Sequence, residues 1–429
     1  MADNKSNAAW KNLIDKYDIV NHVQHSGEFE ISASQIKEFR EPRLMAKWDS
    51  SEDLPSVLKS NKLNILPVSR STYCVSDYRL YQILPVISSE RIQYVPTREY
   101  ESIDFDNLTS ESNAINAMTI TGILDDFLDA PAGSTVETFN GRMGTGAFSF
   151  SVDNLHGGQS KVHVNNAQLE IDGGFENDNS VIIMEAKNVP HPDFHVRQLY
   201  FPYRLWLTKV KKPIRLVFSQ YVDSIYHLYE YEFADPYNYS SIRLLQRRDY
   251  TFQASAITWD DLREIWERTS PVTDDNQDEA EVPFPQANNF KNVITLMQRL
   301  SQVENMNAGE IADYMEFDPR QSSYYAAAGE YLGVFDRTPS DGVSLSHEGK
   351  RIMTFRVKER RLALVELMFK HEIFHYFFGI MYGKGNLPTQ SEIEDVMRLH
   401  NICNSVSTLP RRASSVLGWL RWISSLVDE

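Results

Sequence analysis

The middle of the chain alternates between apolar and polar positions in a pattern that predicts strands. Residues 146–152, 161–171 and 180–187 each show period-two alternation or a short apolar run of strand length. Glycine, aspartate and asparagine residues, which are typical of turns, stand between the second and third segments. We therefore predict that the second strand ends near Asp172, directly before a hairpin-like turn into the third strand.

Predicted helices precede and follow these strands. Residues 109–128 place apolar side chains at helical spacing behind a Ser or Thr that can cap a helix, and a second helix is predicted over 193–209. Two further segments, 213–222 and 224–233, have the composition of strands. This succession of helix, strands, helix and strand predicts a mixed-sheet core, of the α+β or α/β class and of one domain in size.

The first hundred residues predict a small mixed domain. Helices are expected from about Ser6 to Tyr17 and from Ser32 to Phe39, followed by short strands. The segment from Ser34 to Arg43 has two interpretations, either a helix and turn that reads DNA or a plain amphipathic surface helix.

The C-terminal part of the chain predicts a winged helix. Residues 306–315, a turn at Asp318-Pro319 and residues 320–335 have the pattern of helix, turn and helix. The next segment has the pattern of a strand pair, with Asp341-Gly342 as its tip. Helix, turn, helix and wing in this order are typical of a winged-helix domain.

A chain of 429 residues is longer than one hydrophobic core usually spans. The acidic, proline-flanked segment from Pro271 to Pro285 is its clearest internal boundary. We predict an N-terminal domain, a mixed-sheet core, an acidic linker and a C-terminal domain, over residues 1–100, 101–268, 269–288 and 289–429.

The net charge of −16 opposes a nucleic-acid partner, because binding to phosphates requires Lys and Arg. However, part of the acidity lies in the linker, while basic residues gather in 37–48, in 350–361 and around Arg411-Arg412. This uneven distribution weakens the objection without removing it.

Cysteine content and hydropathy predict the compartment. Cys74 and Cys403 are the only cysteines and are far apart in sequence, so neither a disulfide framework nor a cysteine-rich metal site is supported. The N-terminus has no cationic flank before an apolar run, and no stretch reaches about 18 apolar residues. We expect a soluble, cytoplasmic protein.

Charged residues end the apolar run of segment 180–187. Glu185 and Lys187 are two positions apart, so on a strand they point to the same face, about 6.6 Å apart along it. The predicted turn brings the Asp172 carboxylate beside Glu185, and a divalent cation would relieve their repulsion. Mg²⁺ prefers oxygen ligands and is held by one or two carboxylates, so Asp172 and Glu185 are the candidate metal ligands. Lys187 is then placed to orient the attacking water and to stabilise the charge that develops during phosphodiester hydrolysis.

Glu170 is a candidate for a supporting role in the same site. It lies one period-two step before Asp172 and shares its strand face, as a supporting residue or a ligand of a second metal. The competing interpretation of the whole pattern is an ordinary surface ion pair between Glu185 and Lys187 beside a turn aspartate.

The chain resembles type II restriction endonucleases of the PD-(D/E)xK nuclease superfamily over most of its length, in segments such as QIKEFREPRLMAKWDS, LPVSRSTY, QLEIDGGFE with VIIMEAKN, RQLYFPYRLW, SSYYAAAGEYLGVF and LPRRASSVLGWLRWI. Ile171 stands where the superfamily label has proline, a position at which many members vary. The resemblance implies that Asp172, Glu185 and Lys187 are the catalytic triad and that Glu111 is an additional acidic residue.

The resemblance also implies a fold, an activity and partners. It implies a PD-(D/E)xK nuclease core between an N-terminal DNA-recognition domain and a C-terminal winged-helix domain. The implied activity is Mg²⁺-dependent, sequence-specific hydrolysis of double-stranded DNA. A homodimer is implied because a palindromic site needs one active site for each strand, and a cognate DNA methyltransferase is the implied functional partner.

In related nucleases a glutamine near the position of Gln198 supports the active site or contacts DNA. The alternative interpretation is that Gln198 is a polar neighbour on a packed helix.

Basic and polar residues in these regions are candidates for DNA contacts. Arg142 lies in a glycine-rich segment, GRMGTG, which lacks the terminal Lys-Ser/Thr of a phosphate-binding P-loop. The other candidates lie in the N-terminal basic stretch, on the helix after the catalytic strand and on the second helix of the winged-helix pattern: Arg43, Lys47, Arg197, Arg320, Gln321 and Ser323.

The segment His371-Glu372-Ile373-Phe374-His375 matches the HExxH string of zinc peptidases. A catalytic zinc needs a third protein ligand, and no such pattern follows here, while the aromatic neighbours indicate a packed helix. Two alternatives to a nuclease therefore stay open: a DNA-binding regulator without catalysis, and a zinc metallopeptidase that uses His371 and His375.

Overall fold

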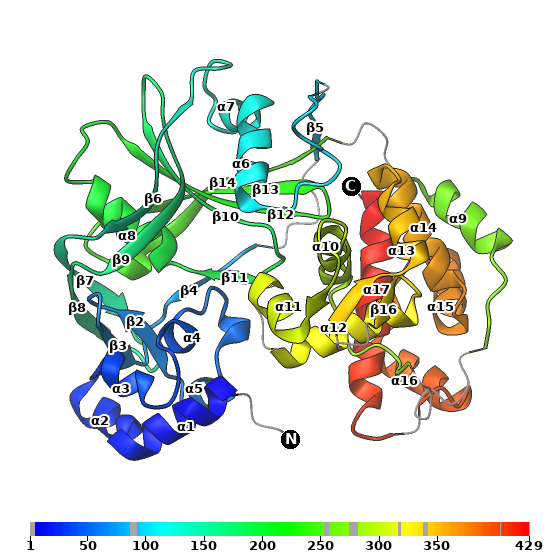
Figure 1. The fold of residues 1–429 in the computed structure, drawn as a ribbon, viewed down its shortest axis with the longest axis horizontal. Helices are drawn as coiled ribbons and strands as arrows, with labels where there is room; N and C mark the ends of the chain where they lie inside the picture. Colours follow the sequence, from blue (N-terminus) through cyan, green and yellow to red (C-terminus); the bar gives the residue numbers. More distant parts are fainter. Residues whose placement is uncertain are drawn as a thin grey trace. The chain divides into compact units, whose positions relative to one another are not determined.

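The computed structural model describes residues 5–85, 92–98, 100–252, 257–273, 282–315, 319–337, 342–403 and 405–428 (Figure 1). The chain forms two compact units. The first unit comprises Met1–Ile87, Ser110–Tyr221 and Tyr226–Asp249, and the second comprises Ser88–Thr109, Val222–Ile225 and Tyr250–Glu429. Each unit therefore combines segments that are distant in the sequence.

The N-terminal part of the first unit packs short helices on a small sheet. Its elements are α1 (Lys5–Tyr17), α2 (Ile19–Ser26), β1 (Phe29–Ser32), α3 (Ala33–Lys37), α4 (Arg43–Ala46), the 3-10 helix η1 (Ser51–Asp53), α5 (Ser56–Ser60), β2 (Asn64–Pro67), β3 (Thr72–Ser76) and β4 (Tyr81–Ile83). Strand β3 pairs antiparallel with β1 and β2. The helices predicted from Ser6 to Tyr17 and from Ser32 to Phe39 are confirmed as α1 and α3, and Ser32 caps α3. Trp10 is fully buried in the core that these helices share.

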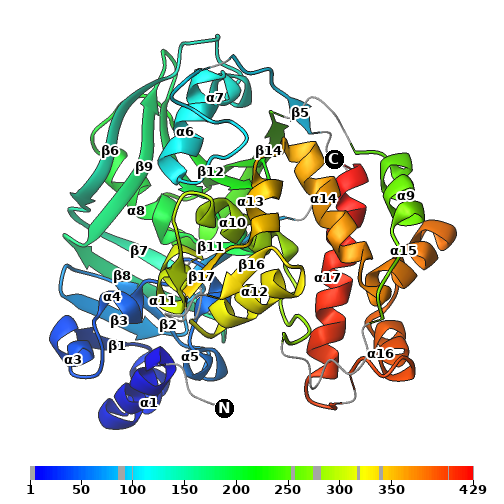
Figure 2. The ribbon, with the colours of Figure 1, turned by 45° about the vertical axis from the view of Figure 1, so that its right-hand side comes forward.

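A mixed seven-stranded sheet contains most of the long strands. Its spatial order is β5 (Gln93–Tyr94), β14 (Ile242–Thr251), β13 (Ile225–Phe233), β12 (Ile214–Val222), β10 (Val181–Lys187), β9 (Gln168–Glu176) and β6 (Val136–Gly144). Strand β9 pairs antiparallel with β6, beside which it lies in Figure 2, and with β10, whereas β10 pairs parallel with β12. Parallel neighbours need a crossover, and α8 (Arg197–Trp206) lies between β10 and β12 in the chain. The predicted mixed α/β class is confirmed.

The first of the long strands precedes a separate strand pair. Strands β7 (Ala147–Asp153) and β8 (Gln159–Asn165) pair antiparallel as a two-stranded sheet between β6 and β9 in the chain. The strand predicted over 161–171 is thus the end of β8 and the start of β9. Asn166, with a φ of +57°, separates them, because a left-handed residue breaks the extended backbone.

The turn predicted directly after Asp172 is wrong. Strand β9 continues through Gly173 and Gly174 to Glu176, and Asn177 caps the turn that follows by accepting from the Ser180 backbone N–H at 2.9 Å. Both glycines have extended rather than left-handed backbones. A Cβ on Gly174 would lie 2.3 Å from the ring and the carbonyl oxygen of Phe139 on β6, so this glycine permits close packing of strands rather than a turn.

The two helices predicted beside the sheet are each shorter than expected. The segment 109–128 forms α6 (Glu111–Ile120) and α7 (Ile123–Phe127), because Gly122 has a φ of +80° that interrupts the helix. In the segment 193–209, the first residues form β11 (Asp193–His195), which pairs antiparallel with β4, and α8 begins only at Arg197. Tertiary strand pairing thus overrides the helical pattern there.

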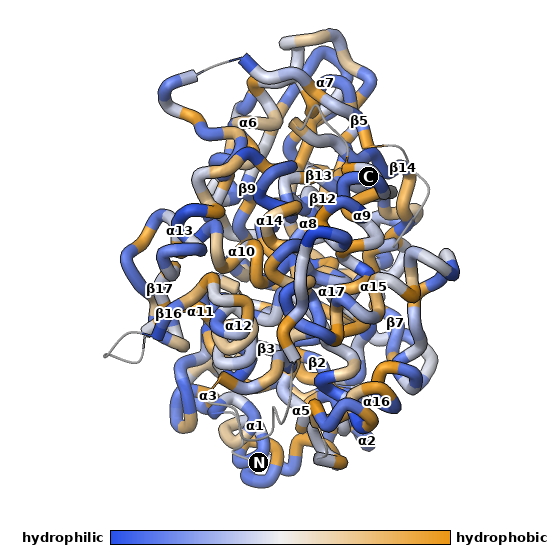
Figure 3. Tube along the Cα trace, turned by 90° about the vertical axis from the view of Figure 1, so that its right-hand side faces the viewer, coloured by the Kyte–Doolittle hydropathy of each residue, from blue (hydrophilic) through white to orange (hydrophobic). Residues whose placement is uncertain are grey.

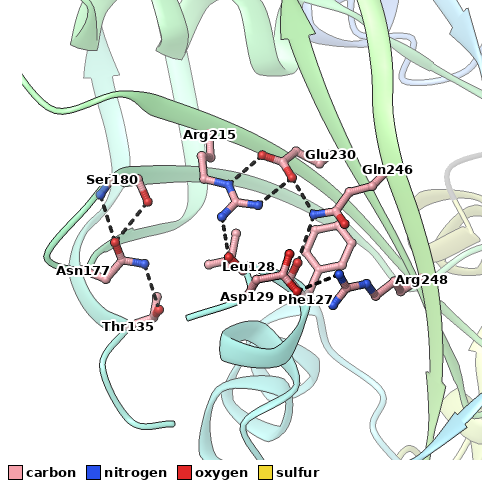
Figure 4. A network of polar contacts seen from close by, with 10 residues as sticks. All are labelled: Phe127, Leu128, Asp129, Thr135, Asn177, Ser180, Arg215, Glu230, Gln246 and Arg248. Carbon is pink, nitrogen blue, oxygen red and sulfur yellow. Dashed lines mark hydrogen bonds and ion pairs between the residues drawn. The ribbon is translucent and has the colours of Figure 1, made fainter. Parts of the chain in front are cut away.

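Helix α7 is fixed to the sheet by a polar network (Figure 4). Arg215 of β12 donates to the Leu128 carbonyl at 2.6 Å and makes two hydrogen bonds, of 2.6 and 2.7 Å, to the Glu230 carboxylate of β13. Gln246 of β14 donates to Glu230 at 2.7 Å and to the Phe127 carbonyl at 3.0 Å. These bonds satisfy carbonyls at the C-terminus of α7, so the helix is held firmly beside strands β12 to β14.

The second unit is mostly helical. Its elements are α9 (Trp259–Arg268), α10 (Phe290–Leu300), β15 (Met306–Asn307), α11 (Ala308–Met315), α12 (Pro319–Tyr331), β16 (Phe335–Arg337), β17 (Gly342–Leu345), α13 (His347–Met353), α14 (Val357–Phe369), α15 (Glu372–Lys384), α16 (Gln390–Leu399) and α17 (Leu409–Asp428). The Trp419 ring of α17 lies 5.0 Å from the ring of Phe290 and 5.2 Å from that of Phe374, centroid to centroid. Aromatic packing therefore joins α10, α15 and α17.

The helices and strands predicted for the winged-helix pattern are present as α11, α12, β16 and β17. Strand β17 lies between β15 and β16 in an antiparallel three-stranded sheet. The predicted turn at Asp318 and the wing tip at Asp341 lie outside the described residues, as do residues 274–281 of the predicted linker.

Hydrophobic and hydrophilic residues alternate along the trace in Figure 3. Among the residues that the structure describes, no helix is long and apolar enough to cross a membrane. Cys74 and Cys403 are both buried and free, in agreement with the absence of a disulfide framework.

Candidate active site

The end of β10 places two charged side chains in a buried position. Every residue of this strand is buried, because β9 and β12 pair with its two edges. Glu185 and Lys187 point to the same face of the strand, as their spacing predicts, and are 6% and 5% exposed. Charges in such surroundings are costly unless they are paired, so their partners define the site.

Asp172 lies beside this pair. The β9 to β10 ladder ends at Gly173 opposite Met184, and the Asp172 carboxylate then accepts a 2.9 Å hydrogen bond from the backbone N–H of Ala186. Burial raises the pKa of Asp172, against the opposing effects of Lys187 and this N–H. Burial, followed by repulsion from Asp172, raises the pKa of Glu185 well above its usual range. The ionised forms of these two adjacent carboxylates repel each other, so a bound cation would stabilise them strongly.

The Lys187 ammonium is surrounded by carboxylates. Its Nζ lies 3.1 Å from Oδ2 of Asp49, 3.4 Å from Oε1 of Glu185 and 3.7 Å from Oε1 of Glu111. Glu111 is the first residue of α6, which brings the additional acidic residue that the resemblance implied to the same ammonium. Four carboxylates, counting Asp172, thus lie around one lysine.

Gln198 reaches the site from α8. Its Nε2 donates a hydrogen bond to Oε1 of Glu185, the same oxygen that faces Lys187. This contact fixes the orientation of the Glu185 carboxylate. Strands β9 and β10 and helix α8 therefore bring Asp172, Glu185, Lys187 and Gln198 together.

Glu170 lies at the rim of this cluster. It shares the outward face of β9 with Asp172 and raises the pKa of that carboxyl, but its own side chain pairs with Arg142 of β6 at 3.1 Å. Both side chains of this pair are largely exposed. Glu170 therefore influences the charge of Asp172 from the rim of the site.

Asp49 is the site residue that the sequence did not single out. It follows α4 in the N-terminal part of the first unit and is 6% exposed. Burial alone would raise the pKa of Asp49, yet the cations Lys187, Lys47 and Arg197 bring it below its usual range. The basic stretch around Lys47 was visible in the sequence, but no spacing relates Asp49 to the distant strands β9 and β10.

Asp172 and Glu185 are the residues best suited to hold a metal ion. They are adjacent, Glu185 is buried and Asp172 is half-buried, and together they supply the number of carboxylates that Mg²⁺ commonly takes from a protein. Within the described parts of the chain, no group of three or more His, Cys, Asp or Glu side chains is arranged as a metal site. The donor set thus fits a hard cation that retains several waters.

Comparison with known proteins divides the chain into three matched segments. Family models described as domains of unknown function, DUF6996, DUF6997 and DUF7226, match residues 7–75, 76–251 and 292–428. None of these descriptions names an activity. No curated protein and no solved structure matches the chain. The candidate site combines Asp49 from the first matched segment with Glu111, Asp172, Glu185, Lys187 and Gln198 from the second.

The predicted DNA-contacting residues lie in several places. Arg43, at the start of α4, is exposed, and Lys47 lies 3.7 Å from Asp49 at the edge of the site. The Arg197 guanidinium lies 5.8 Å from the centre of the Phe201 ring. In the second unit, the other three candidates form the first turn of α12, where Arg320 and Ser323 are exposed and Gln321 is half-buried.

The HExxH motif has a different arrangement. His371 precedes α15 as its N-cap residue, and its ring stacks on Tyr331 with centroids 3.8 Å apart. His375 lies within α15, and its Nε2 donates to the Trp266 carbonyl at 3.0 Å. Because only one histidine is inside the helix, the two do not share a helical face. These contacts favour packing roles for both histidines.

Proposed function

We propose that this protein is a Mg²⁺-dependent endonuclease that hydrolyses phosphodiester bonds in double-stranded DNA. The observation that carries this proposal is the convergence of Asp172, within β9, with Glu185 and Lys187 at the end of β10, with Gln198 bonded to Glu185. Separate strands thus supply a carboxylate pair for a cation and an ammonium for the attacking water, which phosphodiester hydrolysis requires.

The order of elements supports a PD-(D/E)xK core. Helices α6 and α7 precede β6, and β6, β9 and β10 then form antiparallel neighbours. Helix α8 follows and leads to β12, which is parallel to β10. The sequence resemblance implies that Asp172, Glu185 and Lys187 are the catalytic triad of such a core, and these residues lie on the neighbouring strands β9 and β10. Fold order and site chemistry therefore support the same proposal.

In the proposed mechanism, Asp172 and Glu185 would hold Mg²⁺. When bound, this ion polarises a phosphoryl oxygen and lowers the pKa of a coordinated water. Lys187 orients the attacking water and stabilises the negative charge that develops on the phosphate. Gln198 keeps the Glu185 carboxylate in its binding orientation through the hydrogen bond to Oε1.

The second unit supports a role in DNA binding. Its order α10, β15, α11, α12, β16 and β17, with β17 central in the small sheet, matches that of a winged-helix domain. In this proposal the first turn of α12 contacts DNA through Arg320, Gln321 and Ser323. We further propose a sequence-specific type II restriction enzyme that acts as a homodimer, with a cognate methyltransferase as its functional partner.

Cleavage assays test this function. The purified full chain with Mg²⁺ is expected to cut methylated or unmethylated DNA of diverse origin into discrete fragments. Lys187→Ala and Glu185→Gln should each lower the cleavage rate by roughly 10²-fold or more, with DNA binding retained, because the charge stabilisation or the metal is lost.

The matched control is Glu176→Gln on β9, which neutralises a half-buried carboxylate that pairs with Lys212, and it should cut at the normal rate. The absence of cleavage on all of these DNAs would refute the proposal. DNA binding of equal strength with and without Mg²⁺, and without nicking, would instead indicate a DNA-binding regulator.

A further inference from the structure

The segment that carries Asp49 is fastened to the strand that precedes α8. The backbone N–H of His195 donates to the Asp49 carbonyl at 3.0 Å. The Asp193 carboxylate accepts from the Ser50 hydroxyl at 2.7 Å, from the Ser51 backbone N–H at 2.8 Å and from the Ser51 hydroxyl. Residues 49–51 are therefore held in a defined place beside β11, directly before the helix that supplies Gln198.

The Asp49 side chain is only partly satisfied in this place. Its Oδ2 lies 3.1 Å from Lys187 Nζ, while its buried Oδ1 has no hydrogen-bond partner among the described residues. A buried carboxylate with an unsatisfied oxygen costs stability, and a buried ion pair is weak evidence for a stabilising role. The arrangement is therefore better explained by a role in the site than by stability of the fold.

We propose that Asp49 is a positioning residue of the active centre, an inference that rests on the proposed nuclease function. Asp49 and Glu185 contact the Lys187 ammonium at 3.1 and 3.4 Å. With Glu185 bound to the metal, the anchored Asp49 carboxylate remains as the contact that directs the Lys187 ammonium at the attacking water. The N-terminal region thus contributes Asp49 to the catalytic site.

This role predicts a specific kinetic change. Asp49→Asn keeps the size of the side chain but removes its charge, and should lower kcat by roughly 10- to 100-fold, the range found for residues that support a metal site. The dissociation constants for DNA and Mg²⁺ should change by less than about threefold, because Asp172 and Glu185 still bind the ion. Asp49→Glu, which restores the charge, should recover part of the lost kcat.

Two further variants separate positioning from folding. Ser51→Ala removes one hydrogen bond that anchors the segment and should lower kcat in the same direction but by less, even if Asp49→Asn does not fold. The control is Asp77→Asn, which alters a carboxylate of the same region that accepts from His156 at 2.8 Å, away from Lys187. It should leave kcat unchanged.

The outcomes distinguish the two proposals. If the unaltered chain does not cut DNA, the nuclease function and the role of Asp49 both fail. If the unaltered chain cuts and Asp49→Asn and Ser51→Ala cut at the same rate, only the role of Asp49 is overturned. If Asp49→Asn instead weakens Mg²⁺ binding in proportion to kcat, Asp49 is a metal ligand and the positioning role is wrong.

Discussion

The end of the β9–β10 ladder and the start of α15 each carry a short motif associated with metal-dependent hydrolysis, yet their side chains are arranged very differently. At the end of the ladder, the backbone of Ala186 and the side chains of Lys187 and Gln198 hold Asp172 and Glu185 together. At α15, His371 stacks on Tyr331, and His375 bonds to a carbonyl of α9.

The difference shows what a motif requires beyond its spacing. Two residues on one strand keep their relative direction wherever the strand is placed, so Glu185 and Lys187 face the same way. Two histidines four positions apart face the same way only when both are inside one helix, and His371 lies before the first residue of α15. Substitutions in the two regions test whether the first depends on its close strand packing and whether the second lacks a catalytic role.

Among the substitutions in the two regions, the largest loss of stability at neutral pH is expected from Gly174→Ala in the first region. The added Cβ would lie 2.3 Å from the Phe139 ring and its carbonyl oxygen, and a backbone oxygen cannot move without displacing β6. We expect a loss of about 1–3 kcal/mol of unfolding free energy, measured by urea denaturation. DNA cleavage should fall as well, because β9 carries Asp172.

The matched control for this change is in the second region. Gly383→Ala in α15 places its Cβ in open space, so it should be neutral or stabilise the helix by up to about 1 kcal/mol. Equal stability of the two variants would show that the close approach of β6 and β9 is not what Gly174 permits.

The next effect depends on pH and concerns His195 of β11. Burial, and then repulsion by Arg197, lowers the pKa of His195 to about 3, while Nδ1 accepts hydrogen bonds from Arg197 N–H and Tyr239 Oη at 3.2 Å. Below an unfolded pKa of about 6.5, the unfolded chain binds a proton that the native chain does not. The stability present above that pH should therefore decrease by roughly 1.4 kcal/mol per pH unit as pH falls toward 3.

Urea denaturation at several pH values measures this slope. His195→Gln loses the titrating ring, so its stability, although lower at pH 8 because of poorer packing, should fall less steeply between pH 6 and pH 4. Identical slopes for the two proteins would show that His195 does not contribute to acid sensitivity.

Local patterns in the sequence predicted much of the fold but only part of the site. Alternation identified the strands because side-chain direction on a strand is a local property, and the same property placed Glu185 and Lys187 on one face. Gly173-Gly174 was misjudged as a turn because glycine serves both turns and close packing, and only the position of Phe139 on another strand distinguishes them. Asp49 was missed because its place depends on hydrogen bonds between residues 49–51 and β11, two segments that are distant in the sequence.

The smallest effects are expected in the second region, from His371→Ala and His375→Ala. The first removes the stack on Tyr331 and the second removes the hydrogen bond to the Trp266 carbonyl, so each should cost about 1 kcal/mol of stability. Neither should alter DNA cleavage, and elemental analysis of the unaltered protein should find no stoichiometric zinc. The opposite result would be zinc that the unaltered chain binds and that His371→Ala loses, together with hydrolysis of a peptide substrate. That result would make α15 the catalytic region. Because His371 stands outside the helix, zinc binding would require α15 to extend by one residue at its N-terminus and the ring to leave Tyr331, a rearrangement that the circular dichroism of Tyr and Trp would detect.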